Sequence, residues 1–470
     1  MKNHSIMLMA ILLVVACFAL PPGARAVSPA PDGCYPNYTT AEGCNALAVL
    51  TTGIANTAVG WYSLSSVGPN SFNTGVGTGA LALNNADSNT AVGSEAMLLN
   101  VSGFENVANG TEALLNNVSG SYNNAVGVFA LLNNLDGSFN NAFGNQALSQ
   151  NMYASDNTAI GDLALANNDS TGDNLAYFNT AVGAQALFYN TDGNSNTAVG
   201  WQALYYNDAG NFNTANGGFT LFSNLEGVNN TATGYAALSG NVSGNANTAI
   251  GFEALLNNYN GDFNTAIGTD AGANVITAAN VTCIGANVAG ADVSNTTWIG
   301  NVYGVTPQSG TTSPVIVSDD GQLGTVASSE RFKKDIATMQ KTSEAVLSLR
   351  PVTFHYKTDA KGTPQFGLIA EEVAKVDPAL VLPDKQGKPY TVRYDAVNAM
   401  LLNEFLKEHR KVEQLEKQIE VLTAGLQKVS AQLASASPSR RTAGRLEANK
   451  FAVGRIRGGG HATRTVFNDQ

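Results

Sequence analysis

A repeat of seventeen residues constrains this chain more than any other feature. The glycine that closes Asn-Thr-Ala-Val-Gly and its variants occurs fifteen times between Gly60 and Gly300, and eleven of the fourteen intervals are 17 residues; the others are 16, 22 and 15. The surrounding consensus is N-T-A-V-G-x-x-A-L-x-x-N-x-x-G-x-x. Seventeen residues are too few for a pair of helices, and Gly and Asn at fixed positions disfavour helix. We therefore predict a mainly β fold in which each repeat forms one coil with two short strands and Gly or Asn corners.

Stacked coils of this kind form a repetitive parallel β-roll or solenoid. Equivalent residues lie above one another about 4.8 Å apart, so fifteen coils give a rod of roughly 70 Å. The Asn positions then form hydrogen-bonded ladders, and the Ala and Leu positions form a continuous core. Cys283 takes the Ala position of its copy, which predicts a small buried hydrophobic residue there. We assign the repeat head to residues 56–304.

The basic residues divide the chain in two. No Lys, Arg or His occurs from Val27 to Ala327, where 20 acidic residues stand, whereas 23 Lys or Arg face 16 acidic residues from Ser328 onward. The head therefore has no histidine base, lysine nucleophile, arginine phosphate clamp or His metal ligand. Carboxylate catalysis, calcium binding and a threonine ladder for ice are the alternatives left, but most of the acidic residues stand in turn sequences such as LDG and TDG. We expect no metal and no cofactor.

The first 26 residues have the pattern of a secretory signal peptide. Lys2 precedes the apolar run IMLMAILLVVACFAL, and Ala24-Arg25-Ala26 forms a small-residue cleavage site. We therefore expect an exported protein, extracellular or at the cell surface, with a lipoprotein anchored at Cys17 as the alternative. In the N-terminal segment 27–55, Cys34 and Cys44 enclose nine residues, so export makes a local disulfide between them plausible.

Two adjacent serines stand at the composition boundary. Residues 305–327 are predicted as a linker followed by two strands around the turn of PVIVSDDGQLGTV, and ASSERFKKDIATM follows. Ser328 or Ser329 can cap a helix, or either can pair with Lys333 as a nucleophile and its base. Ser329 is four residues from Lys333 and shares its face on a helix, whereas Ser328 is five away and needs a turning segment. Spacing alone leaves both pairs open.

The remaining segments have structural interpretations. PVTFHYK predicts a strand with His355 packed in it, and FGLIAEEVAKV predicts a strand leading into a helix with solvated Glu371 and Glu372. Apolar residues from Leu401 onward recur at steps of three and four, so 401–434 predicts an oligomeric coiled coil, for which three strands suit the head. The basic tail 435–470 is expected to be flexible and solvated, and no nucleic-acid partner is expected.

Two resemblances extend these predictions. NTAVGAQALFYNTDGNSNTAVGWQALYYN, like the rest of the segment from Asn56 to about Gly304, resembles the coiled head repeats of bacterial trimeric adhesins, whose β-roll subunits assemble three to a head. SSERFKKDI, LRPVTFHY, FGLIAEEVAKVDP and YTVRYDAVNAMLLNEFLKEHRKVEQLE resemble the C-terminal intramolecular chaperone domain of phage endosialidases and tail fibres. The second resemblance implies a small α+β domain over 328–400.

In that chaperone family a Ser-x-x-Arg-x-Lys motif carries the chemistry. The resemblance implies that Ser328 is the nucleophile, Lys333 the base and Arg331 a supporting residue, and that the chain is cut between Ala327 and Ser328. It thus implies a single-turnover, autoproteolytic serine peptidase. The expected protein is a homotrimeric fibre or adhesin whose head meets an extracellular glycan or surface ligand. The alternative is a permanent trimer that is never cut.

Overall fold

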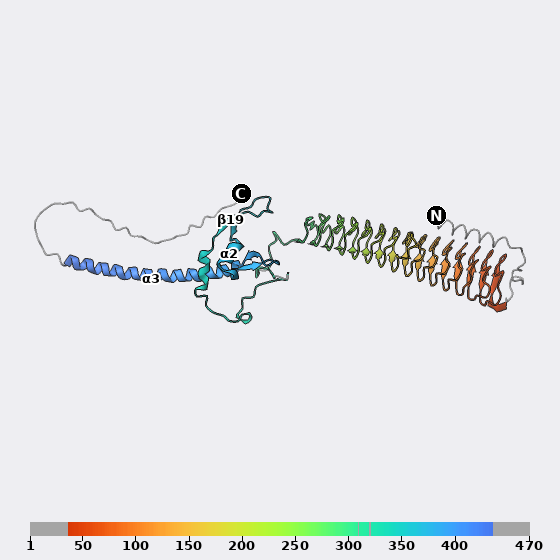
Figure 1. The fold of residues 1–470 in the computed structure, drawn as a ribbon, viewed down its shortest axis with the longest axis horizontal. Coiled ribbons are helices and arrows are strands. Elements are labelled where there is room, and N and C mark those ends of the chain that lie inside the picture. Colours follow the sequence, from red (N-terminus) through yellow and green to blue (C-terminus); the bar gives the residue numbers. More distant parts are fainter. Residues whose placement is uncertain (1–35, 309, 319–320, 436–470) are drawn as a thin grey trace. The chain divides into compact units, whose positions relative to one another are not determined.

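Sixteen short strands in sequence order form one parallel sheet along the N-terminal unit (Figure 1). The computed structural model describes residues 36–308, 310–318 and 321–435, and it divides into two compact units between Pro307 and Gln308. The predicted signal peptide, Cys17, Cys34 and the basic tail from residue 436 lie outside the described residues. The pairing of Cys34 with Cys44, which is exposed, therefore stays a prediction.

Each coil contributes one three-residue strand that pairs in register with the next. Thr197, for example, pairs with Thr180 on one side and Thr214 on the other. After the turn η1 (Pro36–Tyr38), the strands are β1 (Thr40–Glu42), β2 (Thr57–Val59), β3 (Thr74–Val76), β4 (Thr90–Val92), β5 (Val107–Asn109), β6 (Asn124–Val126), β7 (Asn141–Phe143), β8 (Thr158–Ile160), β9 (Thr180–Val182), β10 (Thr197–Val199), β11 (Thr214–Asn216), β12 (Thr231–Thr233), β13 (Thr248–Ile250), β14 (Thr265–Ile267), β15 (Thr282–Ile284) and β16 (Thr297–Ile299). The mainly β, parallel solenoid fold predicted from the repeat is confirmed.

The solenoid begins one coil before the glycine repeat predicted from sequence. β1 pairs with β2 through Thr40 and Thr57. Its closing residue, Gly43, stands 17 residues before Gly60, so the spacing was present in the sequence. The coil was missed because Thr39 occupies the Asn position and Glu42 the Val position.

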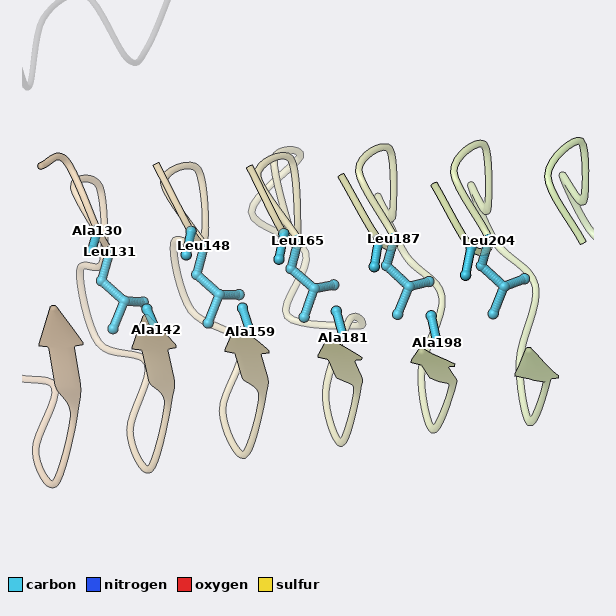
Figure 2. Packing of buried hydrophobic residues seen from close by; sticks show 14 of the residues in the cluster. Ala130, Leu131, Ala142, Leu148, Ala159, Leu165, Ala181, Leu187, Ala198 and Leu204 are labelled. Atoms are coloured by element: carbon cyan, nitrogen blue, oxygen red, sulfur yellow. The ribbon is translucent and has the colours of Figure 1, made fainter. Parts of the chain in front are cut away.

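The interior of the solenoid is built from the Ala and Leu positions of the repeat. The leucines of successive coils lie in one row, opposite the strand alanines that point into the same interior (Figure 2). Leu131, Leu148 and Leu165 are each fully buried, as are the strand alanines Ala142 and Ala159. Cys283, at an Ala position, is 1% exposed, which confirms the prediction of a buried residue, and burial raises the pKa of its thiol.

Two ladders of buried asparagines join the coils. In the first, the backbone N–H of Asn140 donates to Oδ1 of Asn123 at 2.9 Å. In the second, Nδ2 of Asn134 donates to Oδ1 of Asn117 and to the carbonyl of Gly137, both at 2.8 Å. A buried polar group without a hydrogen-bond partner is strongly destabilising. Each coil therefore needs the neighbouring coil to supply the hydrogen bonds that its buried asparagines would otherwise make with water.

The second side of each coil is not the strand that the sequence predicted. Gln146 and Leu148 both have left-handed backbone conformations, with φ of 55°. A strand requires extended φ and ψ at successive residues, so the alternation of left-handed residues bends this side into turns. It still bonds to the next coil, because the N–H of Leu148 donates to the carbonyl of Ala164 at 3.0 Å.

An insertion and the last coil each use a carboxylate to accept backbone N–H groups. In the 22-residue interval, buried Asp169 accepts from Tyr153 at 2.8 Å, Ala154 at 3.1 Å and Asn174 at 2.8 Å. Burial raises the pKa of Asp169, and these bonds act in the opposite direction. Near the end of the head, Asp292 accepts from three consecutive N–H groups, at residues 276 to 278, at 2.7 to 2.9 Å. In both places the carboxylate accepts backbone N–H groups of the preceding coil, at a point where the next coil departs from the regular 17-residue length.

The C-terminal unit consists of short elements and one long helix (Figure 1). Val346, Val373, Leu380, Val392, Val397 and Met400 form its buried core. The elements are β17 (Ile316–Val317), β18 (Leu323–Gly324), η2 (Glu330–Phe332), η3 (Thr342–Ser348), β19 (Val352–Phe354), β20 (Gln365–Gly367), α2 (Ala370–Val376), η4 (Pro378–Leu380), β21 (Val381–Pro383), β22 (Pro389–Val392) and α3 (Tyr394–Ser435). Three antiparallel pairs, β17 with β18, β19 with β20 and β21 with β22, accompany the helices.

Replacing one asparagine of the ladder tests how strongly the coils depend on it. Asn134→Ala leaves Oδ1 of Asn117 without its donor and removes one of the two donors to the carbonyl of Gly137. We therefore expect the free energy of unfolding of the head to fall by about 1–3 kcal/mol. Asn260→Ala, at an exposed position, is the matched control and should change it little. Denaturant unfolding followed by circular dichroism measures the free energy of unfolding of both variants. If the two substitutions lowered it equally, the buried asparagine ladder would not stabilise the head more than an exposed asparagine does.

Asp292 predicts a pH dependence of head stability. The N–H groups of Ile276 and Thr277 lower its pKa from 3.8 to about 2. Because the folded pKa lies below the unfolded one, the stabilisation is present above the ordinary value and is lost as pH falls toward the folded pKa. Asp292→Asn should lower the unfolding midpoint at neutral pH, with the difference from the parent disappearing in acid. Asp162→Asn, an exposed control, removes the same charge; a similar pH-dependent loss in both variants would contradict this prediction.

Candidate active site at Ser328 and Lys333

A single tight turn brings Ser328 and Lys333 together. η2 closes through bonds from Phe332 N–H to the Ser329 carbonyl at 3.0 Å and from Lys333 N–H to the Glu330 carbonyl at 2.9 Å. The chain therefore reverses between Ser328 and Lys333, and Nζ of Lys333 lies 3.2 Å from Oγ of Ser328. Spacing had left Ser328 and Ser329 open as partners; the structure joins Lys333 to Ser328.

The alternative structural role for the serines was a helix cap. Ser329 does stand at the N-terminus of η2, but its side chain makes no capping hydrogen bond. Its backbone is extended, with φ of −65° and ψ of 140°, and the element that follows is a single turn. Neither serine therefore caps a helix through its hydroxyl, because the Ser328 hydroxyl is bonded to Lys333.

The contact between hydroxyl and amine suits general base chemistry. A neutral lysine amine can accept the hydroxyl proton at this distance, and the resulting alkoxide is a strong nucleophile. A water-exposed lysine is protonated at neutral pH and then donates instead. All residues from 321 to 340 that the structure describes are exposed in the single chain, so the site is assembled but not enclosed.

Arg331, the third residue of the motif, faces a different neighbour. Its guanidinium carbon lies 4.6 Å from the centroid of the Phe332 ring, a cation–π contact within the same turn. The Phe332 ring is itself 62% exposed. The structure thus does not bring Arg331 onto the pair of Ser328 and Lys333. Ala327, on the other side of the expected cut, is exposed and outside any regular element.

One further sequence prediction needs correction. His355 was expected to pack within a strand, but β19 ends at Phe354 and His355 is exposed, because the chain leaves the sheet one residue earlier. Glu372 was expected to be solvated, and its side chain is 39% exposed. The sequence did not predict that it also receives two bonds from Arg350, at 3.0 Å from Nε and 2.5 Å from the second terminal nitrogen. These bonds lower the pKa of Glu372.

A second contact between serine and lysine lies where sequence reasoning found nothing. Ser343 is fully buried; its hydroxyl donates to Glu404, and it accepts from Asn403 at 2.7 Å and Lys407 at 3.3 Å. Lys407 also bonds to Glu404 at 2.6 Å, and the pKa of Glu404 is lowered by Lys407 and Ser343. The Glu404 carboxylate thus bonds to both Lys407 and Ser343, and this cluster fastens α3 to η3. Ser343 lies 60 or more residues before these three partners in the sequence, so no local motif predicts this cluster.

The fold and this site define a class: a repetitive β-solenoid followed by a small domain with a long C-terminal helix. Residues 328–382 match the Peptidase S74 family, described as the chaperone of endosialidase. The match begins at Ser328, the residue that contacts Lys333. The chain therefore carries a C-terminal chaperone domain of this type after its repeats. No curated protein and no solved structure matches the chain.

Among the residues that the structure describes, no group of three or more His, Cys, Asp or Glu side chains is arranged to hold a metal ion. Within the same ranges, no helix has both the length and the apolar character needed to cross a bilayer.

Substitution of each serine tests which of them acts with Lys333. Ser328→Ala and Lys333→Ala should each reduce the appearance of a C-terminal fragment beginning at Ser328 by about a hundredfold or more, because each removes one member of the pair. Ser329→Ala should cleave like the parent chain, because its hydroxyl is not bonded to Lys333. Denaturing gels with N-terminal sequencing measure the product. If Ser329→Ala abolished the fragment and Ser328→Ala did not, Ser329 would be the nucleophile and this prediction would be wrong.

Proposed function

We propose that this chain is a trimeric fibre or adhesin-like protein whose C-terminal domain directs assembly and then cuts itself off before Ser328. The observation that carries the proposal is the contact of Lys333 with Ser328, 3.2 Å long, at the first residue of the family match. A head of sixteen stacked strands before that domain supports an elongated structural product. The chemistry, the assembly and the location outside the cell are each part of this proposal.

The cleavage proceeds in two balanced steps. Lys333 Nζ takes the proton of the Ser328 hydroxyl, and Oγ attacks the carbonyl carbon of Ala327. The bond between this carbon and the Ser328 nitrogen breaks, the nitrogen takes the proton from Lys333, and an ester links Ala327 to Oγ. Water then hydrolyses the ester, which leaves a carboxylate on Ala327 and a free amine and hydroxyl on Ser328. No cofactor is needed, because each proton moves between groups of the pair or water.

Assembly into a trimer is supported by the apolar row on α3. The side chains of this row are 48% to 70% exposed in the single chain, although they are spaced as a coiled-coil seam. They are Phe405, Val412, Leu415, Ile419, Leu422, Leu426, Val429 and Leu433. The charged groups of α3 form pairs beside the row, such as Lys411 with Glu408 at 3.7 Å. A helix with such a seam is stable when other copies cover it.

The exposed site links cleavage to assembly. An exposed lysine is protonated and a poor base, whereas burial disfavours the charged form. Residues 321–340 are exposed in the single chain, and they include large apolar side chains within a few residues of the pair in sequence, such as Phe332 and Ile336 at 62% and 64% exposure. In the proposed mechanism neighbouring copies cover these side chains, so the pair becomes reactive after the trimer forms.

The order of assembly and cutting has a physical purpose. Every coil pairs with residues 15 or more positions away, so a solenoid folds slowly and exposes strand edges that attract wrong partners. A domain that trimerises first raises the effective concentration of the heads for one another. Removing it afterwards leaves an assembled head held by a large barrier to unfolding. A glycan or other surface ligand for the head belongs to the same proposal.

A charge placed in the α3 seam tests the link between assembly and cleavage. Ile419→Lys puts an ammonium group into the proposed coiled coil and should reduce both trimer and cleavage by about tenfold or more. Val421→Lys, off the seam and 72% exposed, is the matched control and should change neither. Light scattering and gels follow the two properties. A trimer that stays uncut in the parent chain would favour the permanent, uncleaved assembly instead.

A further inference from the structure

The outward side of the strand row carries the same two residue types along almost the whole head. In the strands from β2 to β15 the middle residue points into the core and the first and third point outward, whereas all three residues of β16 are exposed. The third position is apolar in twelve of the fifteen strands from β2 to β16, and it is exposed or half-buried in all of them. These residues are Val59, Val76, Val92, Val126, Phe143, Ile160, Val182, Val199, Ile250, Ile267, Ile284 and Ile299. The first position is mostly threonine. We call these two rows the strand face.

Other outward positions of the repeat vary freely. The residue that follows the closing glycine is Trp61, Thr78, Asp162, Ala184 or Tyr235 in different coils. An exposed position without a partner has no reason to keep its residue type, since surface substitutions usually change stability little. Strand propensity favours Thr and Val, but it does not require an apolar side chain on the exposed side. The constancy of the strand face therefore indicates a contact outside the single chain.

Charge points to the same face. The segment from Val27 to Ala327, which contains the head, has 20 acidic residues and no Lys or Arg. Two copies of it therefore repel each other unless their contact excludes carboxylates. The outward positions from β2 to β16 hold no charged residue. Acidic residues recur instead on the side that follows the strand, as Glu95, Glu112, Glu253 and Asp270. The strand face is thus a surface on which copies of this chain can meet without opposing charge.

We propose that the strand faces of three copies meet along a common axis and form the interface of the head. This inference rests on the proposed trimer and adds the surface that makes it. At about 4.8 Å per strand and a width of about 10 Å, the face offers roughly 700 Å² per copy, close to the ~800 Å² per partner of a stable interface. Equivalent strands then lie at the same height, so each valine or isoleucine packs against its counterparts.

Cross-linking of the uncut full chain, in the Ser328→Ala background, tests this arrangement. Val199→Cys places a thiol on the strand face, and Leu225→Cys places one elsewhere at similar exposure, 38% against 42% for the native side chains. With a short bismaleimide, Val199→Cys should give dimers of chains in about fivefold higher yield than Leu225→Cys, because its counterparts lie at the same height. Ser328→Ala without added cysteines gives the background from the native cysteines, which are Cys17, Cys34, Cys44 and Cys283 in the full chain.

Lysine pairs supply a second, matched measurement. Ile160→Lys with Ile250→Lys charges the strand face, and Val101→Lys with Ile276→Lys charges corners at similar exposure: 44% and 43% against 49% and 46%. The first pair should remove the cross-link at Val199→Cys and the second should leave it. Circular dichroism establishes that the solenoid is folded in both.

The outcomes separate this inference from the proposed function. A trimeric mass by light scattering with cross-links confined to Val199→Cys supports both. A trimeric mass with equal yields at the two cysteines overturns the strand face as the interface and leaves the trimer standing. A monomeric Ser328→Ala chain overturns the trimer and the interface together. Depression of the freezing point that only the strand-face lysines abolish, with assembly unchanged, overturns the interface and assigns this face to ice.

Discussion

The hydrogen bond from one coil to the next is the interaction on which this structure depends. A strand of three residues has no stability alone, and each coil also holds residues such as Leu148 in a left-handed conformation, which costs about 1–2 kcal/mol per residue. The ladder of backbone bonds and the asparagine contacts, such as Asn134 with Asn117, offset this strain only when a neighbouring coil is present. The coil is therefore a unit that exists only in a stack, and the last coil needs Asp292 where the stack ends.

This dependence explains why a chain of repeats is followed by an assembly domain. Because no coil is stable before its neighbours form, the exposed edge of a growing stack can pair with a coil of another copy as easily as with its own. In the proposed assembly, the row of exposed apolar residues on α3 sets three chains in register before the heads close. The pair of Ser328 and Lys333 then stands at the point where this template can be removed.

The sequence was sufficient for features that repeat and insufficient for those that occur once. Fixed spacing predicted the solenoid, the buried Ala and Leu rows and the burial of Cys283, because each residue type recurs in one environment. It did not predict that Leu148 and its equivalents are left-handed, since leucine is not typical of that conformation. At the site, spacing left Ser328 and Ser329 open. The family resemblance pointed to Ser328, and the turn of η2 places Lys333 against it. The cluster of Ser343, Glu404 and Lys407 joins segments far apart in sequence, which no local pattern reveals.

The division of charge between the two units follows from the same requirements. A head without Lys or Arg repels other heads and their misplaced edges, so it approaches another copy only along an uncharged surface. Of the 25 basic residues, 23 stand after Ala327, on the part that the proposed cut removes. In the proposed sequence of events, opposite charges on head and domain favour bringing chains together before the cut. The product proposed to remain afterwards is acidic, so its net charge keeps separate fibres apart, while the uncharged strand faces are the surfaces on which copies can meet.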